Sequence, residues 1–242
     1  MNAGMLVPGN TLTDVFPAST LAGMVLGFLA GAAMAVMLGW GIALLLGRPF
    51  VIRTALVAVA FLFGLSGAVI GDAAWATKRP LNAEEREIAQ QVFGASLHVD
   101  KVKLAFGARL MTFPKRRYSR TPGNTVFFSK KYSGAAETSY LLRRQYLKTL
   151  VHELTHAWQR QHGISVWKKL GPSFGKAAAY DYGDLASRRL EQQYFLDLNT
   201  EQQASLMADY FYCIHYSCPL PGAGCNCEDL EYFAMQVQEK VE

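Results

Sequence analysis

Two histidines are four residues apart, a spacing that lets both bind one zinc ion, and a glutamate follows the first of them. Residues 152–156 read His-Glu-Leu-Thr-His, an H-E-x-x-H motif. Residues four apart on a helix lie on one face, so the imidazoles of His152 and His156 can bind the same ion. Glu153 lies beside that face, where it can take a proton from a water that the ion activates. The motif predicts metal-assisted hydrolysis with Glu153 as general base.

The predicted helix around this motif, over residues 137–162, carries an apolar stripe on another face. With His152 at 0° and about 100° per residue, His156 falls at about 40° and the stripe at about 160–260°. The stripe consists of Leu147, Leu150, Val151, Leu154 and Trp158. We expect the helix to bury the stripe and turn both histidines toward a site. The alternative is a pair of structural histidines satisfied by hydrogen bonds.

A catalytic zinc site needs a third protein ligand, and Glu201 is the residue we expect to supply it. It begins a predicted helix 45 residues beyond His156, which leaves room for the chain to reverse. Asp209 shares its face and can orient a ligand histidine, or it is an ordinary solvated acid. The alternative third ligands lie between the two helices and are Glu191, Asp181 and Asp184.

Two tyrosines lie between the predicted ligands in the chain, at positions 180 and 182. A tyrosine hydroxyl can donate a hydrogen bond to the oxyanion of a tetrahedral intermediate. We expect Tyr182 to have this catalytic role. The alternative is that both rings anchor a loop or the core.

Three segments resemble one family: residues 150–159 (LVHELTHAWQ), 180–182 (YDY) and 201–204 (EQQA). Together they are similar to the small Vgr-related zinc metallopeptidases, whose core domain is found with contractile injection systems. The resemblance runs from about Arg79 to Tyr212. It implies a zincin-like fold, zinc on His152, His156 and Glu201, Glu153 as base, and a secretion-system or cell-envelope partner. The uncharged N-terminal part and the cysteine-rich tail depart from the family.

The N-terminal quarter contains two long uncharged stretches, residues 15–47 and 54–71. A bilayer core takes about 20 apolar residues as a helix. Small residues recur every fourth position from Gly23 to Gly39, a spacing that lets helices approach closely in lipid. Residues 19–76 are therefore predicted to form a transmembrane helical hairpin in contact with membrane lipid. The alternative is two buried helices of a soluble core.

Positive residues in short loops favour the cytoplasm, and the hairpin loop holds Arg48 and Arg53. This predicts an integral membrane protein with its metal domain in the periplasm. The four cysteines at 213, 218, 225 and 227 allow two disulfides, a metal knot or free thiols. Disulfides, which require an oxidising compartment, are the preferred interpretation.

The predicted fold class is α+β, in which a mainly helical zincin-like domain with a small sheet follows the hairpin. The predicted domains are a tail (1–18), the hairpin (19–76), the metallopeptidase domain (77–216) and a Cys-rich loop with a closing helix (217–242). An Asn82–Glu85 capping box starts a helix ending at Gly94, and Thr200–Gln203 a second one. A further helix is expected from Asp184 to about Leu196. Strands are expected within 97–106, 109–113 and 125–129.

Charge is divided unevenly along the chain. Residues 101–176 have a net charge of +14, from 16 Lys and Arg against Glu137 and Glu153, whereas residues 177–242 have 3 against 11 acids, a net of −8. Either the two segments attract each other, or the basic one faces a polyanion such as lipid headgroups. No nucleic-acid motif accompanies the basic residues, so we expect no nucleic-acid partner.

The sequence is compatible with two functional classes of protein. The first is a zinc-dependent peptidase acting on a protein, a peptide or a peptide crosslink of the cell wall. The second is a catalytically silent, zinc-stabilised interaction module. The intact Glu153 favours the enzyme, because a structural zinc site needs no general base.

Overall fold

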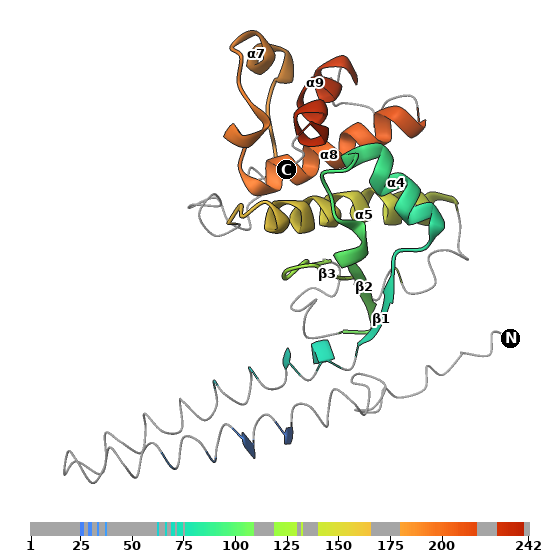
Figure 1. Ribbon diagram of the computed structural model, residues 1–242, viewed down its shortest axis with the longest axis vertical. Helices are drawn as coiled ribbons and strands as arrows, with labels where there is room; N and C mark the ends of the chain where they lie inside the picture. The colour runs from blue at the N-terminus through green and yellow to red at the C-terminus, as the bar shows by residue number, and fades with distance from the viewer. Residues whose placement is uncertain are drawn as a thin grey trace, which may run out of the picture. The chain divides into compact units, whose positions relative to one another are not determined.

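The computed structural model describes residues 76–108, 119–129, 132, 140–165, 180–216 and 227–239, and scattered positions between 25 and 74. The chain divides into two compact units, Met1–Thr77 with Gly107–Arg116 and Lys78–Phe106 with Arg117–Glu242. The second unit holds the H-E-x-x-H motif and is the one described below (Figure 1). The domain boundaries at residues 18, 76 and 216 stay predictions.

Helix α4 (Ala83–Phe93) begins and ends where the sequence predicts. The Asn82 side chain accepts from the Glu85 amide, and the Glu85 carboxylate accepts from the Asn82 amide, which completes the capping box. The chain leaves the helix at Gly94, whose φ of +58° suits a residue without a Cβ.

Helix α5 (Tyr140–Gln161) is the central element of this unit and carries both motif histidines. The predicted apolar stripe is buried: Leu150, Val151 and Leu154 are fully covered. Helix α8 (Thr200–Tyr216) packs along α5 more extensively than any other element does. In Figure 1, α5 lies between α8 and the sheet.

The start of α8 corrects one prediction. The capping box is Asn199–Gln202, one residue before the predicted pair Thr200–Gln203. Oδ1 of Asn199 accepts from the amides of Glu201 and Gln202, and Oε1 of Gln202 accepts from the Asn199 amide. Asn caps as well as Ser or Thr, and here the true cap leaves Thr200 and Gln203 buried within the helix.

The sheet has three strands in the order β1–β2–β3: β1 (Thr77–Pro80), β2 (Lys103–Phe106) and β3 (Thr125–Phe127). Strands β2 and β3 are parallel, with Leu104 opposite Val126. The first part of the predicted strand 97–106 is instead the 3₁₀ turn η1 (Val99–Lys101). β1 was not predicted, and the predicted strand 109–113 lies outside the described residues.

Helix α7 (Leu185–Leu190) is capped by Asp184 as predicted but ends six residues early. Gln192 adopts a φ of +55°, which a continuing α-helix does not allow, and the 3₁₀ turn η6 (Phe195–Asp197) follows. Helix α9 (Cys227–Gln238) closes the unit against α8. A disulfide joins Cys213 at the end of α8 to Cys227, whereas Cys218 and Cys225 lie outside the described residues.

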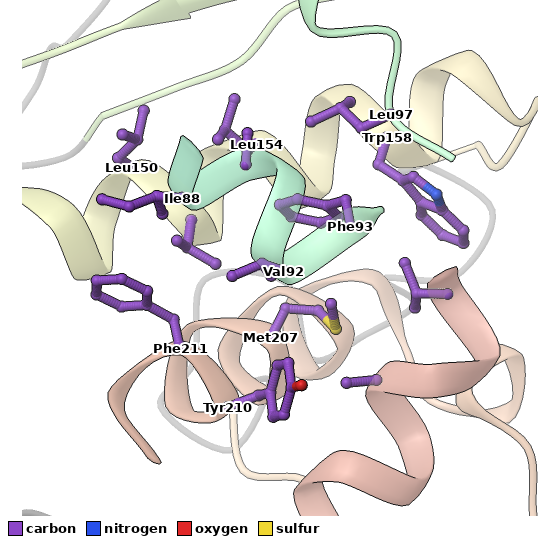
Figure 2. Packing of buried hydrophobic residues seen from close by; sticks show 14 of the residues in the cluster. Ile88, Val92, Phe93, Leu97, Leu150, Leu154, Trp158, Met207, Tyr210 and Phe211 are labelled. Atoms are coloured by element: carbon purple, nitrogen blue, oxygen red, sulfur yellow. The ribbon is translucent and has the colours of Figure 1, made fainter. Parts of the chain in front are cut away.

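One hydrophobic core joins the four long helices. Figure 2 shows side chains of α4 meeting those of α5 and α8, with α9 beside them. The labelled residues are Ile88, Val92 and Phe93 of α4, Leu97 after it, Leu150, Leu154 and Trp158 of α5, and Met207, Tyr210 and Phe211 of α8. This core fixes the separation of α5 and α8, the helices that hold the predicted ligands.

The predicted membrane hairpin is contradicted. Within the part of the chain that the structure describes, no helix is both long and apolar enough to span a membrane. The prediction counted uncharged residues, but a span also needs one continuous helix of about 20 apolar residues. Most of residues 19–76 lie outside the described residues. The fold class is corrected to a mainly helical body with a three-stranded sheet, and the transmembrane, lipid-contacting and periplasmic assignments are withdrawn with the hairpin.

Candidate metal centre

His152, His156 and Glu201 converge to form a candidate metal-binding cluster. One ligand atom from each lies within 4.8 Å of the others. Oε2 of Glu201 is 3.2 Å from Nε2 of His152 and 3.5 Å from Nε2 of His156. Ligand atoms about 2.0–2.1 Å from a tetrahedral zinc ion are roughly 3.3 Å apart. The two distances from Oε2 of Glu201 to the histidine nitrogens therefore suit a tetrahedral ion.

The two helices position these ligands for separate physical reasons. On α5, burial of the apolar stripe turns the histidines toward α8, leaving their side chains 20% and 11% exposed. On α8, Glu201 lies in the first turn, where the helix dipole and free amides favour a carboxylate. Its side chain is 16% exposed. Packing of α8 against α5 then brings the carboxylate to the imidazoles.

The three groups perturb one another electrostatically. Burial lowers the pKa of His156, but hydrogen bonding to Glu201 and the charges of Glu153 and Glu201 outweigh burial and raise its pKa to about 9. Burial raises the pKa of Glu201, but hydrogen bonds with His152 and His156 outweigh it and hold that pKa well below its usual range. Protons and a cation thus compete for the same nitrogen lone pairs, as expected at a metal site.

Gln159 fixes the ring of His156. Its Oε1 lies 2.8 Å from Nδ1 of His156 and can only accept there, so the proton of the neutral ring belongs on Nδ1. Nε2 is then left with a lone pair directed at the cluster. The amide nitrogen of Gln159 donates to the carbonyl of Thr200 and to the side chain of Gln203, both at the start of α8. This fully buried side chain therefore ties the histidine helix to the glutamate helix.

Glu153 is buried beside the cluster, with 5% of its surface exposed. Its Oε2 accepts a hydrogen bond of 2.7 Å from the hydroxyl of Thr121. Thr121 is held in place because its neighbour Arg120 pairs with Phe127 of β3 through two backbone hydrogen bonds. The sheet therefore orients the carboxylate that the sequence predicts to be the general base.

Asp209 does not orient a ligand histidine through any bond that the described residues show. It forms an ion pair with Lys148 at 2.5 Å and accepts a 2.8 Å hydrogen bond from the hydroxyl of Tyr182. The ion pair links the basic and acidic segments of the chain, as one reading of the charge division expects. The ring of Tyr180 lies near a ligand, with its centroid 6.1 Å from that of His152.

The alternative third ligands are engaged elsewhere. The carboxylates of Asp181 and Asp184 accept from the amides of Gly183 and Ala186 in the loop before α7 and in its first turn. Glu191 accepts from the side chain of Gln193. Among the residues that the structure describes, only Glu201 joins the two histidines, and no fourth His, Cys, Asp or Glu does so.

Sequence reasoning missed Gln159, Thr121 and Lys148. Gln159 follows His156 by three positions, so helical spacing alone could have identified it as a partner of that ring. Lys148 precedes His152 by four positions and could have been placed on the same face. Thr121 gave no local signal, because the sheet brings it to Glu153 from 32 residues away.

Part of the chain is similar in sequence to a protein of a bacterial secretion system. No family model and no solved structure matches the chain. The chain is 34% identical over 147 residues, 60% of its length, to the type VI secretion system spike protein VgrG2b of Pseudomonas aeruginosa. That match spans 14% of the spike protein's own length. The chain is thus a partial homologue of a type VI secretion spike protein.

Proposed function

We propose that this chain is a zinc-dependent peptidase that works in the context of a type VI secretion system. The main support is the distance of Oε2 of Glu201 from Nε2 of each histidine, 3.2 and 3.5 Å, which suits a tetrahedral ion. Two histidines and one carboxylate are a ligand set of catalytic zinc sites that leave a fourth position open. When bound there, zinc would polarise a substrate carbonyl and make hydroxide available near neutral pH.

In this proposal Glu153 transfers the proton from the attacking water to the leaving nitrogen. Glu153 takes it from the attacking water as the new C–O bond forms at the substrate carbonyl carbon. It then delivers the proton to the departing nitrogen as the C–N bond breaks, so that one water is consumed for each amide cut. The hydrogen bond from Thr121 holds one carboxylate oxygen and leaves the other for this work.

Tyr182 is proposed to donate its hydroxyl to the developing oxyanion. A phenol has one proton, and here Tyr182 directs it to Asp209. The role therefore requires the hydroxyl to turn from Asp209 to the substrate, with Lys148 remaining as the partner of Asp209. Tyr182→Phe should lower turnover and leave zinc binding intact, with Tyr180→Phe as the matched control. Equal turnover in Tyr182→Phe and the wild type would assign the tyrosine to the scaffold instead.

The test of the enzyme is metal-dependent cleavage of a peptide mixture. Chelation should abolish cleavage, added zinc should restore it, and Glu153→Gln should retain zinc without cleaving. Glu191→Gln, a carboxylate change outside the cluster, is the control and should cleave normally. Cleavage by Glu153→Gln at the wild-type rate would refute the mechanism.

The second candidate is a zinc-stabilised interaction module without turnover. The similarity to a spike protein favours it, since that relative is a component of a secretion system. Under this alternative, zinc should raise the thermal stability of the chain in wild type and in Glu153→Gln alike, while neither protein cleaves any peptide.

A further inference from the structure

The metal cluster is one end of a longer polar seam between α5 and α8. Along α5, side chains at four-residue spacing face this seam, and the side chains of α8 meet them in antiparallel order. The members are Arg144, Lys148, His152 and His156 of α5, and Glu201, Asp209, Tyr212 and Tyr216 of α8. Most of these side chains are half-buried, so the seam lies at the rim of the helix interface.

Arg144 occupies the far end of the seam, among three tyrosine rings. Its guanidinium carbon is 4.2 Å from the ring centroid of Tyr216, 5.2 Å from that of Tyr212 and 5.5 Å from that of Tyr140. Such contacts place the cation over the electron-rich faces of the rings. Ring contacts of this kind leave the N–H groups, which lie in the plane of the guanidinium, to bind a planar anion.

The terminal nitrogens of Arg144 are the donors that such an anion can meet. Among the residues that the structure describes, Nε is buried without a hydrogen-bond partner, whereas the terminal nitrogens are not among the buried unpartnered atoms. The two other cations in the first half of α5 are already neutralised, because Arg143 pairs with Glu84 and Lys148 with Asp209. Within the described part of the chain, no carboxylate forms a salt bridge with Arg144. Arg144 is therefore the cation in this half of α5 that a carboxylate could pair with through a charge-assisted hydrogen bond.

We propose that Arg144 binds a carboxylate of a peptide lying along the seam, a specificity that rests on the peptidase function proposed above. Eight helical residues separate Arg144 from His152, about 12 Å at 1.5 Å per residue. An extended peptide covers that distance in three to four residues. The substrate class is therefore a peptide with a carboxylate three to four residues from the bond that is cut. That carboxylate is either the C-terminal group or an Asp or Glu side chain.

The experiment measures binding rather than turnover. The full chain carrying Glu153→Gln and loaded with zinc is applied to an array of immobilised hexapeptides. One arm compares free C-termini with amidated ones, and a second compares Asp and Glu with Asn and Gln within amidated peptides. We expect about tenfold more binding in at least one arm, as one charge-assisted bond to a carboxylate would give. The arm that responds identifies the source of the carboxylate.

Arg144→Gln in the same background should abolish that preference, whereas Arg143→Gln, which removes a neighbouring charge paired with Glu84, should keep it. If Arg144→Gln does not fold, Arg144→Lys takes its place. Lysine keeps the charge but lacks the planar guanidinium, so this variant should retain only part of the preference. An array without acid preference, a preference unchanged in the folded Arg144 variants, or no peptide binding at all would each overturn the inference. Because no cleavage is required, its failure is distinguishable from failure of the peptidase proposal.

Discussion

Two buried glutamates in this protein have opposite hydrogen-bonding environments. Glu85 is 2% exposed and receives two bonds from Arg79, one from the Asn82 amide and one from the Tyr146 hydroxyl. Glu153 is 5% exposed and, among the described residues, receives one bond, from Thr121.

A carboxylate offers about four acceptor sites, so Glu85 is saturated and Glu153 is not. A saturated carboxylate stabilises the fold, and its charge is committed to its partners. An unsaturated one retains acceptor capacity for a proton or a substrate. Burial alone therefore does not distinguish a structural acid from a reactive one, whereas the number of hydrogen-bond donors to its carboxylate does. Exchanging each for glutamine should therefore affect different properties.

Glu153→Gln should have the largest effect, and that effect should fall on turnover. Glutamine keeps the shape and can still accept from Thr121, but it cannot take a proton. The peptide-cleavage rate should fall by about 10²–10⁴. The free energy of unfolding from urea titration should stay within about 0.5 kcal/mol of wild type. A loss of stability as large as that of the Glu85 variant would erase the distinction between the two acids.

Glu85→Gln should reverse this pattern. Removal of the charge leaves the guanidinium of Arg79 without its ion-pair partner. Arg79 is partly exposed, so we expect the free energy of unfolding to drop by about 2–3 kcal/mol rather than more. Urea unfolding checks this value. The cleavage rate of the folded variant at low temperature should match wild type, and a rate lowered as in Glu153→Gln would contradict the structural role.

Acid should remove the contribution of Glu85. Burial raises the pKa of this carboxyl, but its bonds from Arg79, Tyr146 and Asn82 outweigh burial and lower the pKa. Below about pH 4.3, the ordinary value, the unfolded carboxyl binds more protons than the folded one, so acid favours unfolding. The stability difference between wild type and Glu85→Gln should be constant above that pH. It should shrink as pH falls through the folded pKa, and a difference unchanged down to pH 3 would show that the charge contributes nothing.

Thr121→Val should have the smallest effect. Valine keeps the shape of threonine and removes the donor to Glu153, so the base loses its orientation but not its chemistry. We expect about a tenfold lower cleavage rate with unchanged zinc content. Thr149→Val is the control, because that hydroxyl bonds the Gln145 carbonyl on the same helix and the Tyr132 hydroxyl, and neither belongs to the cluster. If both variants cleave at the same rate, Thr121 does not position the base.

Local patterns predicted the elements that hold the site. The Asn82 capping box and Gly94 set both ends of α4, because caps are decided within a few residues. The cluster could be predicted from the sequence for two reasons. The apolar stripe of α5 showed which way the histidines face, and Glu201 stands early in the next long helix. The cap of α8 was misplaced by one residue because Asn199 and Thr200 are both good caps and only packing distinguishes them.

Contacts between distant segments could not be read from the sequence. Strand β1 forms because it pairs within the sheet, not because of its own four residues. The bond from Thr121 to Glu153 and the ion pair of Lys148 with Asp209 likewise join residues far apart in the chain. The hairpin prediction rested on the absence of charge alone, and no helix among the described residues is long and apolar enough to span a membrane.

Metal analysis after equilibrium dialysis against zinc decides whether His152, His156 and Glu201 hold one metal ion. Wild type should retain about one zinc per chain in the site, and Glu201→Gln should bind it at least about 100-fold more weakly, because losing a direct ligand costs more than the 10- to 100-fold of a lost outer-shell partner. Glu191→Gln, which changes an acid outside the cluster, should bind as wild type does. Equal zinc affinity in wild type and Glu201→Gln, or loss of zinc in Glu191→Gln alone, would contradict the assignment of Glu201 as the third ligand.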